Sequence, residues 1–246
     1  MAEKEIEKDI EKDIEKDIEK DIEKQKAIEN IMKSVFPNVS VKDDAEVEKL
    51  ERELEEQQKK ERERQKYENY TKCGVGKKYF DKSIENFMPR NETEEKIKES
   101  IKYFVSNPTN KILLFYGNYG TGKTHLACGI LREIEGLYVT SQKLCIEYET
   151  GADFNAKKNR LQVVTEYAKA QMLVIDEVGR SLNKNLEQNL LNYIISERYA
   201  NNLPLVLVTN LNKKEFVEYL GMAVFDRLIE TCISLEFTGQ SQRQKK

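Results

Sequence analysis

A glycine-rich stretch in the middle of the chain has the residue types and spacing of a phosphate-binding loop. GNYGTGKT fits the pattern GxxxxGK[ST], and it stands between an apolar run and a segment with helical periodicity. In such a loop, glycines allow the backbone to wrap around a phosphate, so that backbone amides and a helix N-terminus face the anion. The residues expected to bind ATP are Gly117, Asn118, Tyr119, Gly120, Thr121, Gly122, Lys123 and Thr124. Lys123 is expected to reach the β- and γ-phosphates, and Thr124 to ligate Mg²⁺.

Two adjacent acids form a second candidate site. MLVIDE places Asp176 and Glu177 at the end of an apolar run, and ligands of open parallel sheets bind at the carboxyl ends of strands. We expect Asp176 to hold Mg²⁺ through water and Glu177 to polarise the attacking water as a general base. Alone, the pair could also be two carboxylates in a turn. Beside a phosphate loop, it favours an ATPase over a small-molecule kinase, which needs no such base.

Three further polar residues belong to this set of candidates. Asn210 ends the next apolar run, VLVTN, where its amide can reach the γ-phosphate or the lytic water; a turn cap is the alternative. Arg227 in FDRL could stabilise transition-state charge at a neighbouring subunit's nucleotide, or form a surface ion pair. His125, the only histidine, has no Ser or Cys partner motif, so we predict a structural role for it.

The elements that must position these residues alternate in type. Strands are expected in KILLFYG, LYVT, QMLVIDE, PLVLVTN and CISLEF. Helices are expected over about 123–134, 141–149, 159–169, 183–201, 213–220 and 222–230. Alternating strands and helices predict an α/β fold with a parallel sheet covered on both faces.

The first part of the chain differs in composition from the rest. Glu, Lys, Asp and Arg dominate residues 1–70, and the glycine-punctuated stretch CGVGKKYF follows. We therefore divide the chain into a charged helical arm, residues 1–75, and an ATPase domain, residues 76–246.

The arm contains a repeat and an apolar face. EKDIEKDIEKDIEKDIEK places isoleucines every fourth residue, so their stripe winds around a helix and makes a poor coiled-coil seam. Residues 28–36 instead give one clean apolar face, suited to docking a partner or to packing against the helix predicted from Asp43. The repeat is predicted to be a solvated extension.

The net charge, the cysteine spacing and the search for targeting and membrane-spanning segments limit the classes of protein to which this sequence can belong. The net charge of −3 neither supports nor excludes a nucleic-acid partner. The spacing of the four cysteines argues against a zinc site and a disulfide framework. We find no signal peptide and no apolar run long enough to span a membrane, so we expect a cytoplasmic protein without membrane contact.

The order of the motifs resembles one group of proteins. GNYGTGKTHLACGI, MLVIDEVGR, VLVTN, YLGMAVFDRLIE and FTGQSQR together are similar to the AAA+ domain of DnaC-type replicative helicase loaders, over about residues 73–246. The related DnaI loaders and IstB transposition ATPases are also similar. The resemblance implies an AAA+ P-loop NTPase core with a parallel sheet and flanking helices, preceded by the arm.

The resemblance also implies roles. Lys123 and Thr124 match Walker A positions, Asp176 and Glu177 match Walker B, Asn210 matches sensor 1, and Arg227 matches the arginine finger that acts in trans. Arg243 matches a family position that usually reads Ser-Tyr-Arg, although Gln242 replaces the aromatic residue. Family members bind a hexameric helicase through their N-terminal domain, self-associate, and contact single-stranded DNA.

The expected function is therefore ATP-dependent loading of a replicative helicase onto single-stranded DNA. For DNA contacts, NAKKNR is the best local basic cluster, with a solvated loop as the alternative. An IstB-like ATPase that assists a transposase, and an ATP-gated adaptor with incidental hydrolysis, remain the rival functions.

Overall fold

The computed structural model describes residues 44–108 and 111–241. The EKDI repeat, the apolar face at residues 28–36 and Arg243 lie outside the described residues. The chain divides into two units, Met1–Lys60 and Glu61–Lys246. The boundary between residues 75 and 76 stays a prediction.

Helix α2 (Asp44–Lys72) is the described part of the arm. Its sequence is dominated by Glu, Lys, Gln and Arg, which are strong helix formers, and it has neither Gly nor Pro. Exposed pairs such as Glu56–Lys60 at 2.7 Å contribute only a few tenths of a kcal/mol each. The last turn differs, because Tyr70 is only 1 % exposed and its hydroxyl donates to the carbonyl of Tyr79.

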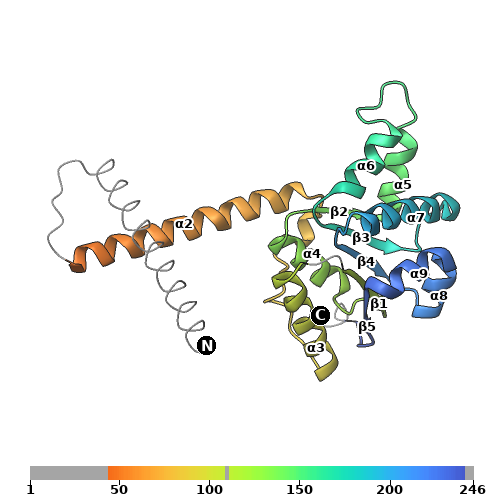
Figure 1. Cartoon of the computed structure of the whole chain (residues 1–246). Helices are drawn as coiled ribbons and strands as arrows, with labels where there is room; N and C mark the ends of the chain where they lie inside the picture. Colours follow the sequence, from red (N-terminus) through yellow and green to blue (C-terminus); the bar gives the residue numbers. More distant parts are fainter. Residues whose placement is uncertain (1–43, 109–110, 242–246) are drawn as a thin grey trace, which may run out of the picture. The chain divides into compact units, whose positions relative to one another are not determined.

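A five-stranded sheet forms the centre of the second unit (Figure 1). Its strands are β1 (Ile112–Gly117), β2 (Leu137–Thr140), β3 (Leu173–Val178), β4 (Leu205–Thr209) and β5 (Cys232–Phe237). They lie in the order β2-β3-β4-β1-β5, and every neighbouring pair is parallel. The predicted parallel α/β fold is confirmed, and each strand falls within or next to its predicted run.

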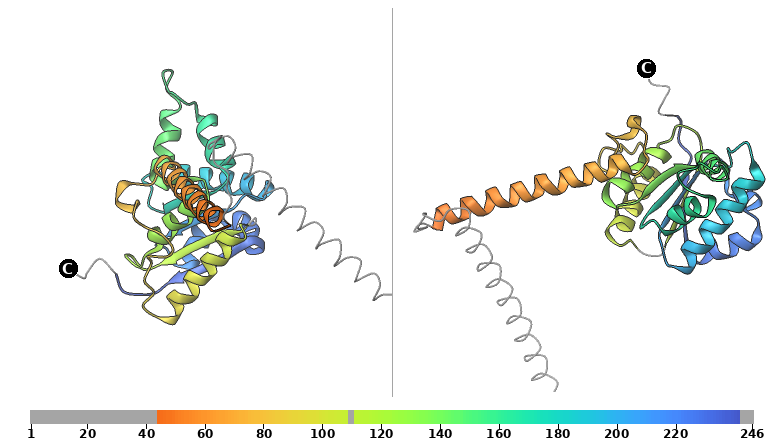
Figure 2. Two further views of the ribbon diagram at one scale, coloured as in Figure 1. Left: turned by 90° about the vertical axis from the view of Figure 1, so that its left-hand side faces the viewer. Right: turned by 90° about the horizontal axis from the view of Figure 1, so that it is seen from above.

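Helices cover both faces of the sheet (Figure 2). They are α3 (Glu92–Ser106), α4 (Lys123–Glu133), α5 (Ser141–Thr150), α6 (Arg160–Lys169), α7 (Lys184–Ala200), α8 (Lys213–Leu220) and α9 (Met222–Thr231). Residues alternate along β1: Leu113 and Phe115 pack with α3 and α4, whereas Ile112 and Leu114 pack in the core that includes α5 to α9.

Two helical elements, one short and one long, were not predicted. The one-turn helix η1 (Lys77–Tyr79) lies in the expected linker, and α3 precedes the first strand. The signals for α3 were present: Asn91 caps its N-terminus, and Ile97, Ile101 and Phe104 give it a buried face. Among the described residues, no helix combines the length and apolarity needed to cross a bilayer.

Candidate nucleotide site

The phosphate loop connects β1 to α4. Gly117 and Gly122 both have positive φ, +110° and +99°, which glycine adopts without strain. A Cβ atom on Gly117 would lie 2.5 Å from the carbonyl oxygen of Phe237, and one on Gly122 would lie 2.6 Å from the ring of Phe87. Gly122 is also the N-cap of α4 and offers no side chain to occupy its first-turn amides. The helix N-terminus therefore suits an anion.

Lys123 is held against the backbone of this loop. Its side chain is largely buried, and Nζ donates to the carbonyl oxygens of Gly117 at 2.8 Å and Asn118 at 2.5 Å. Thr121 Oγ1 donates to the same Asn118 oxygen at 2.8 Å. The ammonium group is thus placed inside the loop that would wrap the phosphates.

The phosphate loop and the acidic strand end meet directly. Thr124 Oγ1 donates to Asp176 Oδ2 at 2.8 Å, although the two residues are 52 positions apart. Asp176 Oδ1 accepts from the Glu177 amide at 2.7 Å. A hydroxyl beside a carboxylate suits Mg²⁺, which prefers oxygen ligands and completes its shell with water and phosphate. Across residues 44–108 and 111–241 there is no cluster of three or more His, Cys, Asp or Glu that could hold a metal by itself.

Glu177 sits at an irregular point of the sheet. The register between β3 and β4 shifts between Ile175 and Val178, and Glu177 has a φ of +58°. Its side chain is exposed, and one carboxylate oxygen lies 3.6 Å from Arg180 Nη1. The Ser141 hydroxyl donates to its carbonyl at 2.9 Å. The backbone thereby turns the carboxylate out of the sheet.

A cleft of about 230 Å³ brings most of the predicted residues together. Eight of its lining residues were predicted: Tyr119, Gly120, Gly122, Lys123, Thr124, Asp176, Glu177 and Asn210. Five polar residues were not predicted to line it: Lys78, Tyr79, Lys82, Arg180 and His125, for which we predict a structural role. Three of these belong to KKYFDK, which carries no motif and reads as linker. The fourth, Arg180, follows the acidic pair within the quoted run MLVIDEVGR.

Arg227 does not line this cleft. It lies on α9, where its Nη1 donates to Ser196 Oγ on α7 at 3.1 Å. The structure therefore separates Arg227 from Glu177 within one chain. An intramolecular finger is not formed, and a role in trans stays a prediction.

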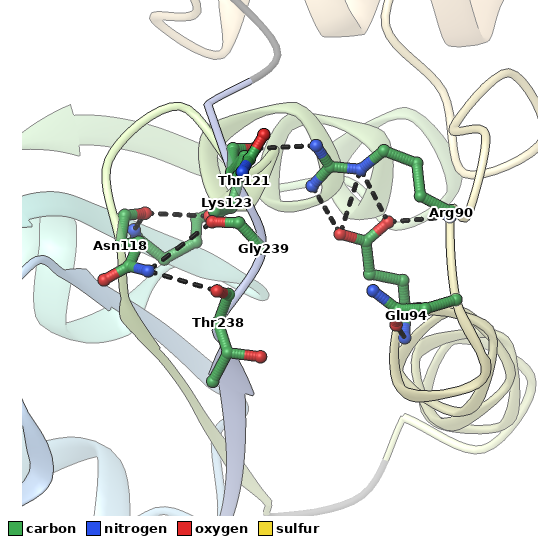
Figure 3. Close-up of polar contacts among 9 residues, drawn as sticks. Arg90, Glu94, Asn118, Thr121, Lys123, Thr238 and Gly239 are labelled. Atoms are coloured by element: carbon green, nitrogen blue, oxygen red, sulfur yellow. Dashed lines mark hydrogen bonds and ion pairs between the residues drawn. The ribbon is translucent and has the colours of Figure 1, made fainter.

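Asn118 faces the segment that follows β5 rather than the cleft (Figure 3). Its Nδ2 donates to the carbonyl oxygens of Thr238 at 3.1 Å and Gly239 at 3.5 Å. Arg90 holds the same segment by donating to the Gln240 carbonyl at 2.6 Å. Burial raises the pKa of Glu94, but hydrogen bonds from Arg90 outweigh this and leave that pKa below its ordinary value. The phosphate loop is thus supported by the end of the described chain.

His125 joins the start of α4 to the preceding segment. Its Nε2 lies 2.9 Å from the Ser83 carbonyl and 2.8 Å from Asn86 Oδ1, so this nitrogen carries the proton. Its ring meets Phe87 edge-on at 5.5 Å. Burial lowers the pKa of His125 below its usual value. These contacts are those of a structural residue, as we expect from the sequence.

Comparison with known proteins identifies the group to which this site belongs. The family model for IstB-like ATP binding proteins matches residues 26–246. The chain belongs to this family. The family description and the AAA+ P-loop fold both support ATP binding by this chain. The match also includes α2 and residues before it.

Individual relatives of this IstB-like chain include helicase loaders. It is 25 % identical over 182 residues to the replicative helicase loader DnaC of Buchnera aphidicola, covering 71 % of this chain and 74 % of that protein. It is 28 % identical over 167 residues to an ATP-binding protein of insertion sequence IS5376 from Geobacillus stearothermophilus, covering 62 % and 63 %. A crystal structure of the DnaC helicase loader has the same fold, with a TM-score of 0.58, 23 % identity and coverage of 66 % and 100 %.

Proposed function

We propose that this chain hydrolyses ATP and uses the cycle to deliver a replicative DNA helicase onto single-stranded DNA. The observation that carries the proposal is the bond between Thr124 and Asp176, which joins the phosphate loop to the acidic strand end within one cleft. Similarity to DnaC loaders supports the choice of task.

The chain's own residues divide the chemistry among them. The loop amides and Lys123 would bind the phosphates of ATP, and Thr124 and Asp176 would hold Mg²⁺. When bound, Mg²⁺ stabilises charge that develops on the phosphoryl oxygens. Glu177 has an exposed carboxylate at the cleft and would accept a proton from the attacking water. Asn210 lines the same cleft and would orient that water.

Two substitutions test this chemistry. Lys123→Ala should abolish ATP turnover, because the loop loses its cation. Glu177→Gln should leave ATP binding intact and lower turnover about 10²- to 10⁴-fold, because the general base is lost. Turnover and fluorescent-ATP binding are the two measurements. Glu218→Gln, an exposed change on α8, is the matched control and should alter neither. Turnover that survives Lys123→Ala would contradict the assignment.

Contact with single-stranded DNA is proposed for the loop at residues 151–159, between α5 and α6. Phe154 in this loop is fully exposed, and Lys157 and Lys158 follow it. An exposed aromatic ring stacks on bases, while lysines contact phosphates. Phe154→Ala should therefore weaken binding to oligothymidylate, measured by anisotropy at fixed salt, by about 1 to 3 kcal/mol. Leu182→Ala, another highly exposed apolar residue, is the control.

The partner protein distinguishes the two candidate tasks. The match to the IS5376 protein favours a transposition ATPase as the second candidate. Crosslinked capture should use the full chain with ATP, against a purified hexameric replicative helicase and a transposase in parallel. Helicase alone supports the loader, whereas transposase alone supports the second candidate. If Glu177→Gln loads helicase as the wild type does, hydrolysis is incidental and the chain is an adaptor.

A further inference from the structure

Tyr138 on β2 is a buried residue whose hydroxyl reaches the candidate Mg²⁺ site. The side chain is 9 % exposed, and its hydroxyl donates to Asp176 Oδ2 at 2.8 Å. The sheet register explains the contact, because Tyr138 pairs with Val174, and Val174 and Asp176 lie two residues apart on the same face.

Three donors from three different segments fix the Asp176 carboxylate. Thr124 and Tyr138 both donate to Oδ2, each at 2.8 Å, and the Glu177 amide donates to Oδ1 at 2.7 Å. Thr124 and Glu177 belong to the nucleotide motifs themselves. Tyr138 lies in neither motif, and in the sequence it reads only as part of the short strand LYVT.

The backbone of Tyr138 is bound to the point where the arm helix ends. Its amide donates to the carbonyl of Cys73 at 2.7 Å. The next residue, Gly74, has a φ of +96°, and a Cβ atom there would lie 2.5 Å from the Tyr138 carbonyl oxygen. Cys73 and Gly74 directly follow α2, which ends at Lys72. One residue therefore contacts the arm junction with its backbone and Asp176 with its side chain.

We infer that Tyr138 is a positioning residue that couples the junction after α2 to the Mg²⁺-binding carboxylate of Asp176. The inference rests on the proposed ATP chemistry and adds a route by which events in the arm reach it. A shift of Cys73 and Gly74 moves the Tyr138 backbone, and the hydroxyl then changes the orientation of Asp176. Nucleotide binding in turn acts on the junction through the same contacts.

Tyr138→Phe removes only the hydroxyl and tests the first contact. Mn²⁺ binding, followed by electron paramagnetic resonance with a non-hydrolysable ATP analogue, should weaken about 10-fold, as for other partners of metal ligands. Binding of the analogue without metal should be unchanged. A Mn²⁺ affinity within twofold of wild type would overturn the inference. If the wild type binds Mn²⁺ with the analogue but hydrolyses no ATP, the proposed function fails and this inference stands.

Gly74→Ala tests the second contact, from outside the cleft. The added methyl group meets the Tyr138 carbonyl, so Mn²⁺ binding should weaken as it does in Tyr138→Phe. Gly76→Ala is the matched control, since its φ is −72° and nothing lies within 4 Å of the added atom. In the Tyr138→Phe background, Gly74→Ala should have no further effect on Mn²⁺ affinity. Equal effects in both backgrounds would overturn the coupling, and urea unfolding confirms that each variant folds.

Discussion

The pH dependence of stability should report on His125. Burial lowers the pKa of this ring from 6.5, while the Ser83 carbonyl and Asp81 oppose the shift and Lys82 and Lys98 add to it. Above pH 6.5 both folded and unfolded chains hold the ring neutral, so its contribution to stability is complete. Below pH 6.5 the unfolded chain takes up a proton that the folded chain resists. The free energy of unfolding should therefore fall until the pH drops below the folded pKa.

Urea unfolding at pH 7.5, 6.5 and 5.5 measures this effect. Because the sequence has one histidine, the difference between wild type and His125→Gln isolates it. That difference should shrink as the pH falls, while carboxylates titrate at lower pH in both proteins. Parallel curves for the two proteins would contradict the prediction.

At the residue scale, the sequence predicts the site residues that belong to a motif with defined spacing, and it predicts few others. The loop and the acidic pair have defined spacing, and Thr124 and Asp176 indeed lie in contact. Tyr138 and Lys82 reach the same region through strand register and loop path, which no spacing in the sequence encodes. The positive φ of Glu177 also depends on the shifted pairing of two strands rather than on its own type.

At the scale of elements, Arg198 ties α7 to the ends of its neighbours. The guanidinium is fully buried and donates to the carbonyls of Tyr167, Ala168, Ala170, Gln171 and Pro204. Burial lowers its pKa to about 10, so it stays charged at neutral pH. Arg198→Met should lower the free energy of unfolding by about 3 kcal/mol or more, because buried carbonyls lose their donor. Urea unfolding measures this.

The matched control for that change is Lys169→Met. Lys169 is exposed at the end of α6, so its substitution should alter stability by no more than about 0.5 kcal/mol. Equal stability of Arg198→Met and wild type would show that the carbonyls find other partners.

Elements that contain continuous apolar runs are the ones that the sequence predicts most directly. Buried strands such as β4 read as continuous apolar runs, and their partners follow from the alternation with helices. Helix α3 is less evident although Asn91 caps it, because polar residues separate its buried Ile97, Ile101 and Phe104 and leave no continuous apolar run. The order of strands comes from packing, and sequence order alone does not give it.

At the scale of the whole molecule, the buried ring of Tyr70 limits how much of the arm can be deleted without loss of stability. Deleting residues 1–60 should leave the thermal unfolding temperature of the second unit unchanged. Deleting residues 1–75 also removes the buried ring of Tyr70 and the Cys73 carbonyl that binds Tyr138. This should lower the unfolding temperature by about 6 to 12 °C. Equal unfolding temperatures would support a boundary at residue 75.

Assembly should be visible as complementation between two inactive chains. Arg227 lies away from its own cleft, so an active site that uses it must receive it from a second copy. Arg227→Ala and Lys123→Ala should each be inactive alone, and mixing them should restore part of the ATP turnover. Mixing two preparations of Lys123→Ala is the control. No recovery in the mixture would contradict a finger that acts in trans.

Glu177 has a left-handed backbone conformation, so we expect selection for stability and selection for activity to favour different residues at this position. Glycine adopts a φ of +58° without the roughly 1 to 2 kcal/mol that other residues incur there. A library selected for heat resistance alone should therefore enrich Glu177→Gly, which removes the carboxylate. Selection for ATP turnover should instead restore glutamate, and the resulting protein should have a lower melting temperature. The proposed catalytic position is thus one where a mutation that stabilises the fold would remove the carboxylate that the chemistry needs.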